Sequence, residues 1–165
     1  LCRLLLQEPD VLLLDEPTSE VDPNTRREFW DELFIMCEAG TTILVTTHLM
    51  DEAERCHHLA IIDQGKKVAD GTPAALKQEL TGRIYSISGP EIDVLRETLK
   101  KTPEILGITQ IGLFLRVVLG EEVENGQALL LEKLRPIPEK IIAQVPPSIE
   151  DVFVMATREN GRNHG

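Results

Sequence analysis

With 165 residues, 42% of them hydrophobic and 27% charged, the chain has the composition of a globular protein with one ordinary domain or two small ones. Seventeen basic and 28 acidic side chains give a formal net charge of −11, which argues against a nucleic acid or an anionic membrane surface as the main partner. The sequence contains no run of 18 or more apolar residues and therefore predicts no membrane-spanning helix.

The first half of the chain alternates between helical and strand patterns. The leucines of residues 1–7 have helical spacing, and because the first residue is not methionine, the chain looks like the back part of a longer protein. The apolar run at 11–14 predicts a strand buried on both faces. Asp22 and Pro23 supply an N-cap and a first helical position, which predicts a helix that ends before Gly40.

The same alternation continues to about residue 80. Residues 41–48 form a second β-branched run, and the stretch 49–56 has the pattern of a short helix. Residues 58–63 predict a third strand, followed by a tight turn and a hairpin on the edge of the sheet. A closing helix begins at Pro73. Strands alternating with helices favour an α/β fold with a parallel sheet covered by helices.

A domain boundary is predicted at Thr81 and Gly82, because the elements restart after it. Residues 83–157 contain strand, helix, strand, strand, helix and strand patterns followed by a last helix, which is the order of a small α+β domain of the ferredoxin-like plan. The stretch 158–165 has no apolar content and is expected to be a frayed tail.

Two serines are predicted to cap helices in this second domain. Ser88 and Glu91 have the spacing of a capping box at the start of its first helix, and Ser148 is expected to cap its last helix. Both predictions rest on local spacing alone.

Asp15 and Glu16 follow the first predicted strand directly. Adjacent carboxylates repel each other, so the pair calls for a metal ion, a proton-transfer task or exposure to water. Because carboxyl ends of parallel strands share one edge of a sheet, we expect the pair to lie near His48, which ends the second strand. One carboxylate there can hold Mg²⁺, another can deprotonate a water, and a histidine can bind a phosphoryl oxygen. This is a phosphoryl-transfer site without a phosphate-binding loop.

The segment VLLLDEPTSEVDP at 11–23, with TTH further along the chain, resembles the second half of the ATP-binding subunit of ABC transporters. The resemblance implies that Asp15 is the Walker B aspartate at Mg²⁺, that Glu16 is the general base toward the hydrolytic water and that His48 senses the γ-phosphate. It also implies that the segment from Ser19 to Asp22 is the D-loop, which crosses to a second ATPase subunit in a dimer that sandwiches ATP.

The resemblance covers residues 1 to about 80. Three of the family's motifs are absent from the sequence. The chain has no GxxxxGK(S/T) phosphate-binding loop, no Q-loop glutamine and no LSGGQ signature. We therefore expect the parent protein to be an ATPase that uses ATP and Mg²⁺, and the chain as given to bind and hydrolyse ATP poorly. Residues 83–157, with VPPSIEDVFV at 145–154, resemble the accessory domain that follows the ATPase core in bacterial subunits for drug and polysaccharide export.

Three functions from different classes remain open. The first is an ATPase subunit, cytoplasmic and peripheral at the inner face of the cell membrane, which forms a homodimer and powers export through a separate integral membrane permease. The second is a soluble ABC-type ATPase without a permease, although the net charge disfavours nucleic acid. The third is a non-catalytic dimerisation or regulatory module. Exposed apolar faces in the first half of the chain also favour self-association of the fragment.

Each candidate residue has a plainer interpretation. Asp15 and Glu16 could be two solvated acids in a turn, and His48 could simply cap a strand. The sequence Cys56-His57-His58 contains three potential metal ligands, but adjacent residues at a helix end point in different directions, which favours an ordinary surface. The cysteines, which number three and show no paired spacing, are typical of reduced thiols in a cytosolic protein.

Overall fold

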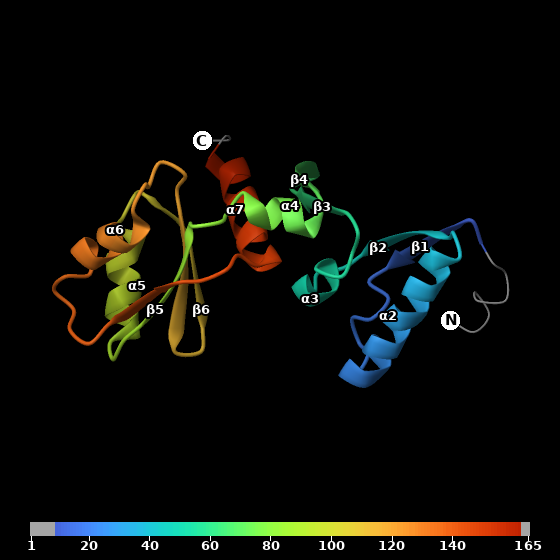
Figure 1. Ribbon diagram of the computed structural model, residues 1–165, viewed down its shortest axis with the longest axis horizontal. Coiled ribbons are helices and arrows are strands. Elements are labelled where there is room, and N and C mark those ends of the chain that lie inside the picture. Colours follow the sequence, from blue (N-terminus) through green and yellow to red (C-terminus); the bar gives the residue numbers. More distant parts are fainter. Residues whose placement is uncertain (1–8, 163–165) are drawn as a thin grey trace. The chain divides into compact units, whose positions relative to one another are not determined.

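The computed structural model describes the backbone of residues 9–162 and the side chains of residues 9–158 (Figure 1). The helix end predicted at 1–7 lies outside the described residues. The chain forms two compact units, one up to Arg55 and one from Cys56 onward, and each is described by itself. The division after Arg55 separates the chain into compact units and does not coincide with the domain boundary predicted at 81–82. That boundary concerns the domains of the parent protein and stays a prediction.

The first unit contains a parallel strand pair. Its elements are β1 (Val11–Asp15), α2 (Pro23–Glu38), β2 (Thr42–Thr46) and α3 (Met50–Ala53). The two strands pair from Val11 with Thr42 to Asp15 with Thr46, so that both strands end at the same edge. A parallel pair requires a crossover, and α2 provides it as predicted.

One face of the parallel pair is packed and the other is exposed. Leu12 of β1 is buried, and α2 buries Trp30, Leu33 and Met36. By contrast, Leu13 is 70% exposed and Leu44 is 63% exposed. The prediction of a strand buried on both faces is therefore wrong for the described residues. Successive strand side chains point to opposite faces, and α2 packs on only one of them.

The second unit begins with a hairpin of β3 (Leu59–Asp63) and β4 (Lys66–Gly71), followed by α4 (Pro73–Gln78). Gln64 and Gly65 both have positive φ, 49° and 76°, which matches the right-handed twist of a two-residue hairpin turn. The hairpin is a separate two-stranded sheet and not an edge of the β1–β2 sheet as predicted. The strands of the hairpin pair with each other because the tight turn brings β4 directly against β3. The apolar pattern of these two strands does not specify a further strand with which they pair.

The rest of the second unit has the predicted βαββαβ order and a terminal helix. Its elements are β5 (Ile84–Ser88), α5 (Ile92–Lys100), β6 (Ile105–Ile111), β7 (Phe114–Leu119), α6 (Gly126–Lys133), β8 (Ile141–Gln144) and α7 (Ile149–Arg162). The four strands form one antiparallel sheet in the order β6-β7-β5-β8. The assignment of this sheet and its helices to the ferredoxin-like class stays a prediction.

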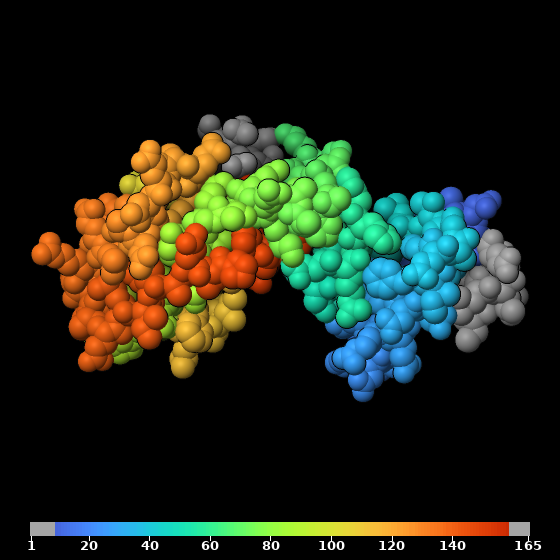
Figure 2. Space-filling model, viewed as in Figure 1, coloured from blue at the N-terminus to red at the C-terminus, as the bar shows by residue number. Residues whose placement is uncertain are grey.

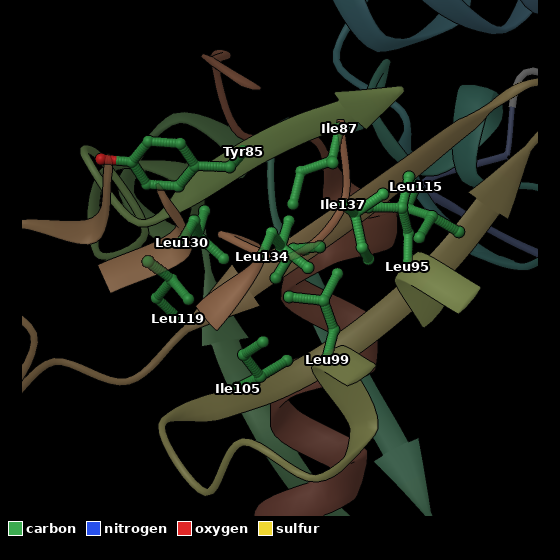
Figure 3. Packing of buried hydrophobic residues seen from close by; sticks show 11 residues of the cluster. Tyr85, Ile87, Leu95, Leu99, Ile105, Leu115, Leu119, Leu130, Leu134 and Ile137 are labelled. Atoms are coloured by element: carbon green, nitrogen blue, oxygen red, sulfur yellow. The ribbon is translucent and has the colours of Figure 1, made fainter. Parts of the chain in front are cut away.

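The core of this unit lies between the sheet and helices α5 and α6. Figure 3 shows Leu95 and Leu99 of α5 and Leu130 of α6 directed toward the sheet, and all three side chains are fully buried. Gly126 starts α6 against the ring of Tyr85, where a Cβ atom would lie 2.6 Å from the ring. A larger residue at this position would push the helix away from the sheet.

Helix α7 packs against β6 and also against α4 and the hairpin. Figures 1 and 2 show α7, in orange-red, beside the green α4. Gly107 of β6 permits this close approach, since a Cβ atom there would lie 2.6 Å from the side chain of Val154. The helix continues to Arg162, past residue 158 where the tail was predicted to begin. Arg158 is held because its guanidinium donates to the carbonyl of Leu106.

An ion pair between the partly buried Arg116 and the buried Asp151 holds the start of α7. The Arg116 guanidinium of β7 contacts both carboxylate oxygens of Asp151, with Nε to Oδ1 and Nη2 to Oδ2 distances of 2.7 Å. Asp151 also accepts from the Ser148 amide at 2.7 Å, and its own amide donates to the Ser148 hydroxyl at 3.3 Å. The predicted Ser148 cap is thus confirmed as a reciprocal capping box. This arrangement raises the pKa of Arg116, chiefly through the hydrogen bonds to Asp151.

The cap predicted at Ser88 is wrong. Ser88 is the last residue of β5 and pairs with Phe114 and Ile141, while Glu91 precedes α5 without a side-chain capping bond. Ser88 therefore belongs to β5, although its spacing from Glu91 predicted that it would cap α5.

None of the helices within the described part of the chain is both long enough and apolar enough to cross a membrane.

Candidate functional site

The acidic pair lies at the carboxyl edge of the parallel strands. The Glu16 amide donates to the Thr46 carbonyl at 3.0 Å and to the Thr46 hydroxyl at 3.1 Å. The same hydroxyl donates to the Asp15 carboxylate. Thr46 therefore ties the end of β1 to the end of β2, two residues before His48.

Glu16 and His48 are in direct contact. Nδ1 of His48 lies 3.2 Å from Oε2 of Glu16, and the two side chains are 61% and 49% exposed. Glu16 has φ of +42°, which is uncommon for a residue with a side chain and turns the backbone sharply at the end of the strand. The side chains predicted to converge from two strands do so in the structure.

Asp15 and Glu16 are both exposed, as expected if they are two solvated acids in a turn. Because both carboxylates are accessible to water, their proximity alone does not require a cation. The contact between Glu16 and His48 is the stronger indication of a site, because it pairs a proton acceptor with a ring that can orient it.

Asp15 fits the requirements of Mg²⁺ at a nucleotide site. Mg²⁺ usually keeps several waters and binds through one or two carboxylates together with substrate phosphates. Asp15 offers one exposed carboxylate at the strand end, oriented by Thr46. Among residues 9–158, no group of three or more potential ligands forms a complete metal cage. This also applies to Cys56-His57-His58, where the His58 ring instead lies 2.6 Å from the carboxylate of Asp70.

Ser19 and Asp22, the predicted D-loop residues, lie in the turn between β1 and α2. Ser19 is exposed, and its amide donates to the Glu16 carbonyl at 3.3 Å. Asp22 is the N-cap of α2, because its carboxylate accepts from the amides of Asn24 at 3.1 Å and Thr25 at 3.2 Å. Hydrogen bonds from Thr25 lower the pKa of Asp22 below its ordinary value of 3.8. The structure thus assigns Asp22 a role in starting the helix.

This capping role can be tested separately from a role toward a second subunit. We expect Asp22→Ala to lower the thermal midpoint of the chain and Asp22→Asn to leave it nearly unchanged, since asparagine caps helices as well as aspartate does. Circular dichroism melts of the three proteins measure this difference. Equal midpoints for Asp22→Ala and the unaltered chain would contradict the capping role.

Glu52 is a residue near the site that the sequence analysis missed. Its side chain is 1% exposed although it belongs to the single turn of α3. Its carboxylate accepts from the hydroxyls of Thr18 and Thr47, the latter at 2.7 Å, and lies 3.6 Å from Nε of Arg26. A helix of four residues is too short for apolar periodicity to indicate which side chain is buried, so no sequence signal distinguished Glu52 from its acidic neighbours.

These features define a class of protein: an α/β domain with two acids and a histidine at the carboxyl edge of a parallel strand pair, the edge at which such folds bind ligands. No protein-family model matches the chain. Curated relatives do match it.

Several curated relatives carry the name Nod factor export ATP-binding protein I. The protein of Paraburkholderia xenovorans is 37% identical over 159 residues, and that of Burkholderia orbicola is 40% identical over 159 residues; both alignments cover 95% of this chain and 50% of the relative. The protein of Cupriavidus metallidurans is 37% identical over 163 residues, which cover 98% of this chain and 52% of the relative. The chain is homologous to these export ATP-binding proteins over nearly its whole length, and this confirms the resemblance. It spans about half the length of the curated relatives it matches.

Proposed function

We propose that the chain is the C-terminal part of an ATP-binding, ATP-hydrolysing subunit that powers export through a separate membrane permease. The observation that carries the proposal is the contact of Glu16 with His48 beside Asp15, at the shared edge of two parallel strands. The names of the relatives, which are export ATP-binding proteins, support ATP as the ligand and export as the process.

In this proposal each residue has a separate task. Glu16 accepts the proton of a water that attacks the terminal phosphoryl group, and His48 orients the Glu16 carboxylate and hydrogen-bonds a phosphoryl oxygen. Asp15 would hold Mg²⁺, which when bound offsets negative charge on the phosphates. Thr46 keeps Asp15 and the backbone of Glu16 in place through its hydroxyl.

Within the complete subunit, the chain contributes to two domains and to contacts with two partners. Residues 1–81 are the C-terminal part of the ATPase domain, residues 83–157 are an accessory domain and residues 158–165 are a tail. Ser19 and Asp22 lie in the turn that meets a second copy of the subunit. The subunit acts at the cytoplasmic face of the cell membrane, where the permease is an integral membrane protein.

The direct test is Mg·ATP binding by calorimetry, with this 165-residue chain beside a longer polypeptide that includes a phosphate-binding loop upstream. We expect binding by the longer polypeptide alone, because a carboxylate edge without a loop of backbone amides and a lysine cannot hold the phosphates. The longer polypeptide should also release phosphate from ATP. Tight binding by the 165-residue chain would contradict the proposed inactivity of the fragment, and absence of binding by both would contradict the proposed function.

A further inference from the structure

Glu52 connects the two loops that carry the candidate catalytic residues. One of its carboxylate oxygens accepts from the hydroxyl of Thr18, which lies two residues after Glu16. The other accepts from the hydroxyl of Thr47 at 2.7 Å, directly before His48. The Thr47 hydroxyl in turn accepts from the Leu49 amide at 3.0 Å. One side chain is therefore hydrogen-bonded to the loop after β1 and to the loop after β2.

Burial makes these hydrogen bonds restrictive. Glu52 and Thr18 are each 1% exposed, so water cannot replace either partner without opening the structure. A hydrogen bond to an ionised group is stronger than one between neutral groups, and both hydroxyls donate to the same carboxylate. The distance between the loops is thereby limited by the size of one carboxylate group.

Arg26 of α2 supplies the charge that a buried carboxylate needs. Its Nε lies 3.6 Å from Glu52, and its Nη2 donates to the carbonyls of Thr18 at 3.5 Å and Val21 at 3.3 Å. Burial raises the pKa of Glu52, but the hydroxyls of Thr18 and Thr47, then the indole of Trp30 and last the charge of Arg26 outweigh it and hold the pKa below the ordinary value of 4.5. The carboxylate is therefore ionised at neutral pH, as the hydrogen-bond pattern requires.

We propose that Glu52 is a positioning residue for ATP hydrolysis, which keeps Glu16 and His48 at contact distance by binding Thr18 and Thr47. The proposal rests on the proposed function of the Glu16–His48 site. It adds a residue whose carboxylate is bound by Thr18 and Thr47 and which acts on the two catalytic side chains through the loops on which they lie. A shift of about 1 Å between catalytic groups lowers rates by up to about 100-fold, so this restraint has a measurable effect.

The test is Glu52→Gln in the complete subunit, with Asp51→Asn as the matched control. Glutamine has nearly the same shape, but its amide NH₂ presents donors where the carboxylate accepted a hydroxyl and faced Arg26. Asp51 lies on the same helix turn and faces the same arginine at 4.0 Å, yet its side chain is 69% exposed. We expect Glu52→Gln to lower kcat at least about tenfold with KM for Mg·ATP within about twofold, and Asp51→Asn to change neither by more than about twofold.

A spectroscopic measurement separates positioning from general loss of stability. The NMR signals of the His48 ring, assigned with His48→Gln, should shift in Glu52→Gln and remain in place in Asp51→Asn. An unchanged kcat, or a change in KM alone, would overturn the proposal. If the unaltered subunit hydrolyses no ATP, the proposed function fails, and the His48 signals still decide whether Glu52 holds the pair.

If Glu52→Gln does not fold, Thr18→Val and Thr47→Val replace it as tests. Each removes one hydroxyl while the carboxylate keeps Arg26 and the other threonine. Each is expected to lower kcat about threefold or more and to shift the His48 signals. Two folded variants with the kcat and the His48 signals of the unaltered subunit would overturn the proposal.

Discussion

Glu16→Gln is expected to lower ATP turnover of the complete subunit by a factor of about 100 or more, while Mg·ATP binding is retained. Glutamine keeps the size of the side chain and a carbonyl oxygen near His48, so the local geometry should persist. It cannot accept a proton from water, and loss of a positioned general base typically lowers rates by factors of about 10² to 10⁴. Phosphate release at saturating ATP measures the turnover, and calorimetry measures the binding.

The matched control for this variant is Asp10→Asn. Asp10 is an exposed acid that precedes β1 at the opposite end of the strand, so the variant makes the same change of charge away from the candidate site. Its turnover should stay within about twofold of the unaltered subunit. Turnover in Glu16→Gln equal to that of Asp10→Asn would rule out Glu16 as the general base.

The second large effect is expected in the other unit. Asp151→Ala should lower the free energy of unfolding by about 3 kcal/mol, because it leaves the Arg116 guanidinium of β7 without its carboxylate partner. It also removes the acceptor of the Ser148 amide at the start of α7. Urea denaturation followed by circular dichroism of the 165-residue chain measures the change.

Glu150→Ala provides the comparison for this prediction. Glu150 is the preceding residue on the same helix turn, carries the same charge and is exposed. Its removal should change the free energy of unfolding by no more than about 0.5 kcal/mol. Equal stabilities of the two variants would contradict the role of Asp151 in fastening α7 to the sheet.

Several elements could be predicted from local sequence because their causes are local. Asp22 caps α2 through amides two and three residues away, and Pro23 fits the first helical position. Gly112, with φ of +58°, separates β6 from β7, two strands that follow each other in the predicted order of elements. Ser148 bonds residues within one helical turn. In each case the partners lie within a few positions, so the sequence places them together.

The predictions that were wrong concern partners distant in sequence. Ser88 belongs to β5 because it pairs with Ile141. This contact joins residues far apart in sequence, so the local spacing of Ser88 and Glu91 could not predict it. Leu13 is exposed because α2 covers one face of β1 only.

The candidate site likewise has features that the sequence predicts and features that only the tertiary structure shows. The residue types and their order, Asp15 and Glu16 after one apolar strand and His48 after the next, were sufficient to predict that these side chains share one edge, since parallel strands end together. The buried position of Glu52 between Thr18 and Thr47 was decided by tertiary structure alone. These partners lie 34 and 5 positions from Glu52, and only folding brings the two loops around one carboxylate. The sequence by itself determined which groups are available for chemistry, whereas packing determined which of them are held against one another, because burial and long-range hydrogen bonds depend on the whole arrangement of strands and helices.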